Sequence, residues 1–180
     1  ENKLQQKARY CFSGEREFAR LLSITRESES NLRARAYYAL NDDDASLLAT
    51  VLEAGLSDED WRVRAVVTNR LQHVDAILAE GILLKALRDP HPEVQSIACK
   101  NLGSFKSQAA FEAMLKIVKN TPLTPVNFGL LKNALEGLRY AVGWKNAAGI
   151  VEERADEEGF PFPNEAAKVI KVLKRRPTRD

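Results

Sequence analysis

The chain has few of the residues from which reactive and metal-binding sites are built. It contains only two cysteines and two histidines in 180 residues. Two cysteines are too few for a disulfide framework, so we expect Cys11 and Cys99 to be small buried side chains in a reducing cytoplasm. His73 and His91 stand 18 residues apart and form no short-spaced ligand pair, so no metal site is expected.

Long apolar runs and glycine-rich motifs are also missing. The longest apolar run, GILLKAL, falls far short of the ~20 residues that cross a bilayer, and nothing resembles a signal peptide. The sequence shows neither a glycine-rich phosphate loop nor a nucleophile elbow. We therefore predict a cytoplasmic protein with no membrane partner, no cofactor and no enzymatic activity.

What the chain does contain is an internal repeat. The blocks NLRARAYYALN, WRVRAVVTNRLQ and PEVQSIACKNLG align on an aliphatic residue with a period of 31, at Leu32, Val63 and Val94. Apolar residues recur within each block at every third or fourth position. This spacing is typical of one face of an α-helix.

A second helical pattern follows each block. ASLLATVLEAGL, AILAEGILLKAL and AAFEAMLKIV align in the same register, at Leu52, Leu83 and Met114. The connectors place Asp or Asn, and twice proline, just before a new helix, where they suit the unpaired N–H groups of the first turn. Repeated antiparallel helix pairs predict an all-α fold, a right-handed α-solenoid.

We predict that this solenoid is one domain spanning residues 1–180. End repeats of such arrays are atypical, because they cover apolar surface that has no neighbour. The repeats are expected at approximately 1–30, 31–61, 62–92, 93–125 and 126–158, followed by a capping helix over 164–176.

The 31-residue unit has an Asp-bearing turn, then Val-Arg, then an Ala/Leu-rich face. It resembles the HEAT repeat, most closely the short bacterial type related to phycobilin lyase subunits, over residues ~15–155. It is weaker where Glu27 replaces the turn Asp and where Gln95 replaces Arg. In HEAT arrays the turn Asp and this Arg often bond between neighbouring repeats. The resemblance therefore implies a structural ladder formed by Arg33, Arg64, Asp58 and Asp89.

The second helices carry the candidate binding surface, since they line the concave side of HEAT solenoids. Their outward stripe changes along the chain, and Leu84 and Leu115 take the position of Glu53. An apolar strip bordered by cations suits an acidic amphipathic helix or peptide. The predicted partner-binding residues are Leu84, Lys85, Arg88, Phe111, Leu115, Lys116 and Lys119. The alternative is that both leucines belong to a broad core face and the lysines are only solvated.

The sequence thus favours a non-enzymatic scaffold that binds a partner protein or peptide on its concave face. The alternative is a nucleic-acid-binding module, with the base-excision chemistry of HEAT-like glycosylases for alkylated purines; chromophore handling as in phycobilin lyases is a further, weaker alternative. Residues 41–60 carry seven acidic side chains and no Lys or Arg. This acidic segment argues against a long DNA track, because phosphate contacts supply much of the affinity for DNA.

Overall fold

The computed structural model describes residues 18–40, 45–140 and 147–175, and within these ranges the chain forms helices and no strand. Residues 18–24 are helical. The helices that follow are α2 (Ser30–Ala39), α3 (Ala45–Gly55), α4 (Trp61–Arg70), α5 (Ala76–Ala86), α6 (Pro92–Leu102), α7 (Gln108–Asn120), α8 (Phe128–Leu138), α9 (Ala147–Ala155) and α10 (Pro163–Arg175), with short 3₁₀ turns η1 (Leu71–His73) and η2 (Pro125–Asn127). The predicted all-α fold of packed helix pairs, a HEAT-like α-solenoid, is confirmed.

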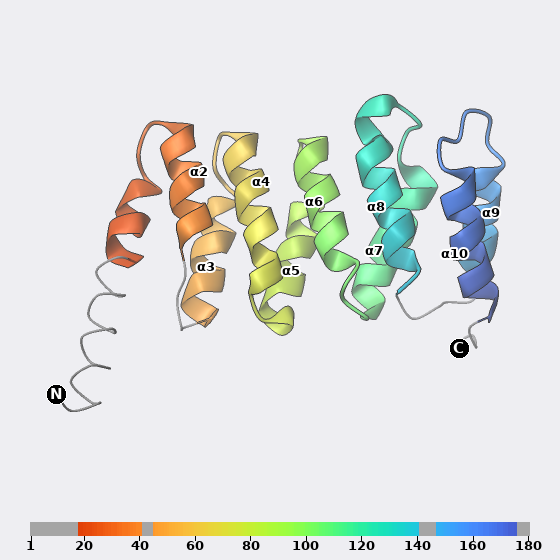
Figure 1. Ribbon diagram of the computed structural model, residues 1–180, viewed down its shortest axis with the longest axis horizontal. Helices are drawn as coiled ribbons and strands as arrows, with labels where there is room; N and C mark the ends of the chain where they lie inside the picture. The colour runs from red at the N-terminus through yellow and green to blue at the C-terminus, as the bar shows by residue number, and fades with distance from the viewer. Residues whose placement is uncertain (1–17, 41–44, 141–146, 176–180) are drawn as a thin grey trace. The chain divides into compact units, whose positions relative to one another are not determined.

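The chain divides into two compact units, residues 1–79 and 80–180. In the first unit α4 packs against both α2 and α3 (Figure 1). The helix α4 begins at Trp61 because the side chain of Asp60 accepts a hydrogen bond from the backbone N–H of Arg62, at 2.9 Å. Its inner face contributes Val63 and Val67, both fully buried. The predicted single domain, its repeat limits and the right-handed sense stay predictions.

In the second unit α8 packs against α6 and α7, and α10 packs against α9 and α8 (Figure 1). Pro92 opens α6, and the ring of His91 accepts a hydrogen bond from the N–H of Glu93. The hydroxyl of Ser107 caps α7 in the same way, by accepting from Ala110. The helix expected over 164–176 is observed as α10, and its capping role stays a prediction.

Burial follows the 31-residue period along most of the chain. Val63 and Val94 are fully buried, as are Leu52, Leu83 and Met114 in the second helices. The alignment fails at Leu32, which is 40% exposed, while the neighbouring Arg33 is buried. The register of the repeat is otherwise kept, because Ala36 and Leu40 are buried like their equivalents Val67 and Leu71.

A close backbone contact joins α6 to α8 in the second unit. The Cα of Gly137 lies so near Gly103 that a Cβ added at Gly103 would sit 3.1 Å from it. A Cβ added at Gly137 would overlap the sulfur of Met114, which is fully buried. Glycine at these two positions lets the end of α6 approach α8.

No helix in the described ranges is both long enough and apolar enough to span a membrane.

Candidate partner-binding groove

In the first unit a buried ion pair joins the turn before α2 to the turn before α4. The guanidinium of Arg33 donates to both carboxylate oxygens of Asp58, at 2.8 Å each, and to the carbonyls of Glu27 and Ser28. Burial opposes ionisation of Asp58, but the hydrogen bonds from Arg33 and from the N–H of Asp60 outweigh it and lower the pKa of Asp58. Arg33 and Asp58 are therefore bonded between neighbouring turns, and the ladder of all four residues stays a prediction.

In the next two repeats the position of Arg33 is taken by Arg64 and Gln95, and the bonds described for these two go to backbone carbonyls. Arg64 donates to the carbonyl oxygens of Asp58 and Glu59, at 2.8 and 3.1 Å. Gln95 donates to the carbonyl of Asp89, at 2.6 Å. We call Arg33, Arg64 and Gln95 the turn-capping residues, because each donates to the carbonyl six residues earlier.

The acidic turn residues complete this arrangement. The carboxylates of Asp58 and Asp89 each accept a hydrogen bond from the backbone N–H two residues later, at 2.9 and 2.8 Å. Gln95 keeps the donating function of arginine without its charge, although the sequence pattern is weaker there. The bond predicted between Arg64 and Asp89 stays a prediction.

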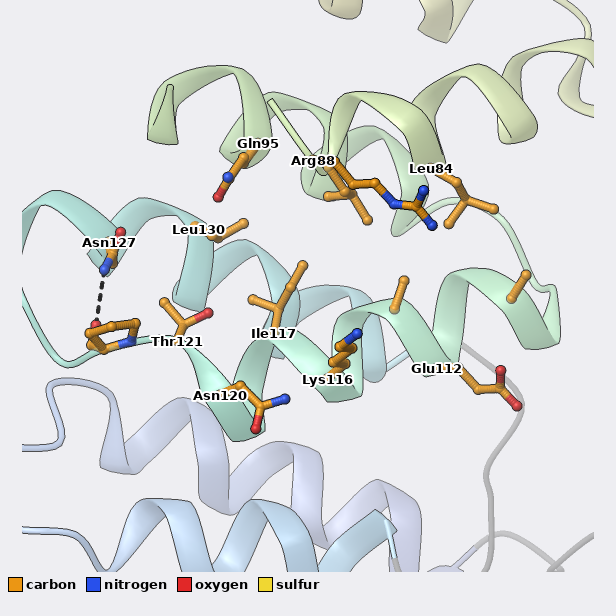
Figure 2. Close-up of a pocket in the computed structure, with 14 residues that line it drawn as sticks. Leu84, Arg88, Gln95, Glu112, Lys116, Ile117, Asn120, Thr121, Asn127 and Leu130 are labelled. Carbon is orange, nitrogen blue, oxygen red and sulfur yellow. Dashed lines mark hydrogen bonds between the residues drawn. The ribbon is translucent and has the colours of Figure 1, made fainter. Parts of the chain in front are cut away.

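A groove of about 610 Å³ lies in the second unit between α5 and α7 (Figure 2). This size is within the usual range for ligand pockets. Gln95 of α6, Leu130 of α8 and the connection after α7 close its sides. Its apolar lining is formed by Leu84, Leu87, Ala109, Ala113, Ile117, Pro122 and Leu130.

Two cations face this apolar lining from opposite sides. Arg88, in the turn that follows α5, and Lys116 of α7 are both exposed, and within the described part of the chain neither side chain makes a hydrogen bond or ion pair. Glu112 is the acidic residue of the lining, and it accepts a hydrogen bond from Gln108, at 3.1 Å. The groove thus offers two cations for an anionic group above an apolar surface.

The connection after α7 is fixed by side chains from two directions. Asn127 donates to the carbonyl of Pro122, at 3.2 Å (dashed line in Figure 2). It also donates to the hydroxyl of Thr124, at 3.0 Å. The buried Arg154 of α9 donates to the carbonyl of Thr121 and pairs with Glu157. This end of the groove is therefore built before any ligand arrives, which reduces the entropy lost on binding.

The structure places the predicted partner-binding residues in different surroundings. Leu84, Arg88 and Lys116 line the groove. Lys85 and Lys119 are exposed outside the lining and Leu115 is half-buried outside it.

The prediction for Phe111 is wrong, because its side chain is 0% exposed. Phe111 stands three residues before Met114 and seven before Val118, so all three share the core face of α7. Sequence reasoning also missed Gln95, Asn127 and Leu130, which reach the groove from other elements.

Little in the described residues points to chemistry. No group of three or more His, Cys, Asp or Glu side chains within them could hold a metal ion. Burial raises the pKa of the Cys99 thiol to about 12, so it stays protonated and unreactive near neutral pH. His91 is engaged as a helix cap. The geometry of the groove suits binding.

Paired helices repeating every 31 residues, with side chains that bond to the turn carbonyls of successive repeats, define the chain as an α-solenoid repeat protein. The HEAT repeat family model matches residues 81–109, which include Leu84, Arg88 and Gln95 of the groove. This match covers one helix pair and supports the HEAT-like character of the repeat. No curated protein matches the chain. The closer resemblance to the phycobilin-lyase-related type stays a prediction.

Proposed function

We propose that this protein is a non-enzymatic scaffold that binds a partner helix or peptide in the groove between α5 and α7. HEAT repeats commonly serve as protein-interaction scaffolds. The observation that carries the proposal is the apolar lining of the groove, flanked on opposite sides by Arg88 and Lys116, cations that have no partner among the described residues. The placement of this groove on the concave side of the array, in a cytoplasmic protein, is part of the proposal.

The expected partner is acidic and amphipathic. Burying one leucine-sized anchor contributes about 1.5–3 kcal/mol, whereas an exposed charge pair contributes about 0–1 kcal/mol. The contact with Leu84, Leu87 and Ile117 therefore supplies most of the affinity. The cations Arg88 and Lys116 select an acidic partner and speed its association.

The proposal is tested by selecting peptides on the intact chain. A displayed random library of peptides about 15 residues long, near the lower limit for an isolated helix, is panned on the wild-type protein. Leu84→Glu should weaken the recovered peptides by at least about tenfold, because it removes the anchor contact and repels acidic groups. Binding constants are measured by fluorescence anisotropy.

Leu115→Glu is the matched control. Leu115 has the equivalent place in the next repeat and is similarly half-buried, but it lies outside the groove lining. Thermal melts establish that both variants fold. Peptides that bind the Leu84→Glu protein as tightly as the wild type would refute the proposed groove.

A further inference from the structure

The charges of the groove are separated along its length. Glu80 of α5 accepts a hydrogen bond from Ser107, the N-cap of α7, so the first turns of both helices meet at one end. Arg88 and Asn120, from the other ends of these helices, line the same groove. The helices α5 and α7 therefore run side by side in the same direction, and Figure 2 shows Glu112, Lys116 and Asn120 in succession along α7.

Along this shared direction an acidic end is followed by a basic one. Glu112 stands four residues before Lys116 on α7, and Arg88 follows the end of α5, four residues after Leu84. Four helical residues rise about 6 Å. Along α7 a carboxylate is therefore followed one helical turn later by a cation, and Arg88 adds a second cation from across the groove.

We propose that the groove discriminates partners by the order of charges around one apolar anchor. This proposal rests on the proposed peptide-binding function. The favoured peptide segment places an apolar side chain over Leu84. It directs a carboxylate toward Arg88 and Lys116 and carries a basic or neutral residue over Glu112. In a helical ligand each charged residue stands three or four positions from the anchor, since residues at that spacing share a face.

Electrostatics opposes the reverse arrangement of the same ligand. Exchanging its two charged residues would set a carboxylate against Glu112 and a cation against Arg88 and Lys116. Like charges brought together suppress wrong partners, and this repulsion adds to the attraction that selects the right one. Among the residues that the structure describes, neither cation has an ion pair that the ligand would have to break.

The test compares each recovered peptide with an isomer in which its acidic and basic residues are exchanged. Peptides that lose binding to Leu84→Glu are used, so that only groove ligands are compared. The wild type should prefer the parent by about three- to tenfold, since exposed charge pairs are individually weak. The double variant Glu112→Lys/Lys116→Glu keeps the net charge of the protein and should prefer the isomer.

Glu112→Gln adds a second measurement without creating a new charge, and it should reduce the preference while retaining binding of the parent. Thermal melts establish that the variants fold. Equal binding of parent and isomer to the wild type would overturn the charge-order proposal and leave the scaffold function standing. Recovery of no peptide that depends on Leu84 would refute both proposals.

Discussion

At the scale of single residues, the turn-capping residues differ in how many bonds they make. Arg33 donates to the carboxylates of Asp58 and Glu59 and to two carbonyls, whereas Gln95 makes one neutral bond to a carbonyl. Hydrogen bonds that involve an ionised group are roughly twice as strong as neutral ones. The turn before α2 is therefore held more firmly than the turn before α6.

Replacing Arg33 with alanine should lower the melting temperature by several degrees. The change leaves the buried carboxylate of Asp58 and the carbonyls of Glu27 and Ser28 without their donor. Arg33→Lys should recover only part of the loss, because an ammonium cannot reproduce the forked geometry. Circular dichroism melts provide the measurement.

Arg62→Ala is the matched control for this loss. Arg62 also pairs with an aspartate, Asp60, but its side chain is 62% exposed, and exposed pairs contribute little. We expect its melting temperature to stay close to that of the wild type. If the Arg33→Ala and Arg62→Ala variants had the same melting temperature, the buried pair would contribute no more to stability than the exposed one.

The sequence predicts the acidic and basic residues of the turns because side chains of fixed type recur at a fixed period. It does not predict that Arg64 and Gln95 bond to carbonyl oxygens, because every residue has a carbonyl and no residue type marks it. It misplaces Phe111 because the apolar face of α7 is one residue wider than the aligned positions suggest. Asn127 and Leu130 join the groove through tertiary packing, which the repeat pattern does not contain.

At the scale of helices, the approach of α6 to α8 depends on Gly103 and Gly137. Their backbones meet where the side chain of Met114 is fully buried. Interiors are packed at the density of organic crystals, so a methyl group added here must displace its neighbours. The contact also fixes α8, which supplies Leu130 to the groove.

Gly137→Ala should destabilise the protein by about 1–3 kcal/mol, the usual cost of overpacking a well-filled core. Gly81→Ala in α5 is the control, because a Cβ added at Gly81 meets nothing within 4 Å. It should stabilise the helix by about 0.5–1 kcal/mol through the lower flexibility of alanine. Urea denaturation gives both values, and a neutral or stabilising effect of Gly137→Ala would mean that Met114 moves aside freely.

At the scale of the whole molecule, the charge of the chain argues for peptides over nucleic acid. The net charge is only +2. The exposed cations of α10 are few, and one of them, Lys174, pairs with Glu152. Acidic residues nearly balance the basic ones in the chain, with 25 Asp and Glu against 27 Lys and Arg. We therefore expect weak attraction to phosphate, which falls steeply with salt.

We expect duplex DNA to bind weakly and to dissociate near physiological salt. Anisotropy of a labelled duplex across a salt series measures this directly. The double variant Lys168→Ala/Lys171→Ala on α10 should remove most of the residual binding, while Leu84→Glu should leave it unchanged. Tight duplex binding at physiological salt, or release of a modified base, would favour the nucleic-acid alternative.

The short reach of the turn-capping residues bears on how such a chain could have grown. Donor and acceptor lie six residues apart, so duplicating a 31-residue stretch of gene copies a complete turn with its own donor. The connection after α7 is different, because the carbonyl of Thr121 depends on Arg154, which is encoded 33 residues later. A copy ending before α9 would inherit that connection without its donor. We therefore expect that a central repeat can be duplicated by itself, whereas the segment from α7 to α9 can be duplicated only as a whole.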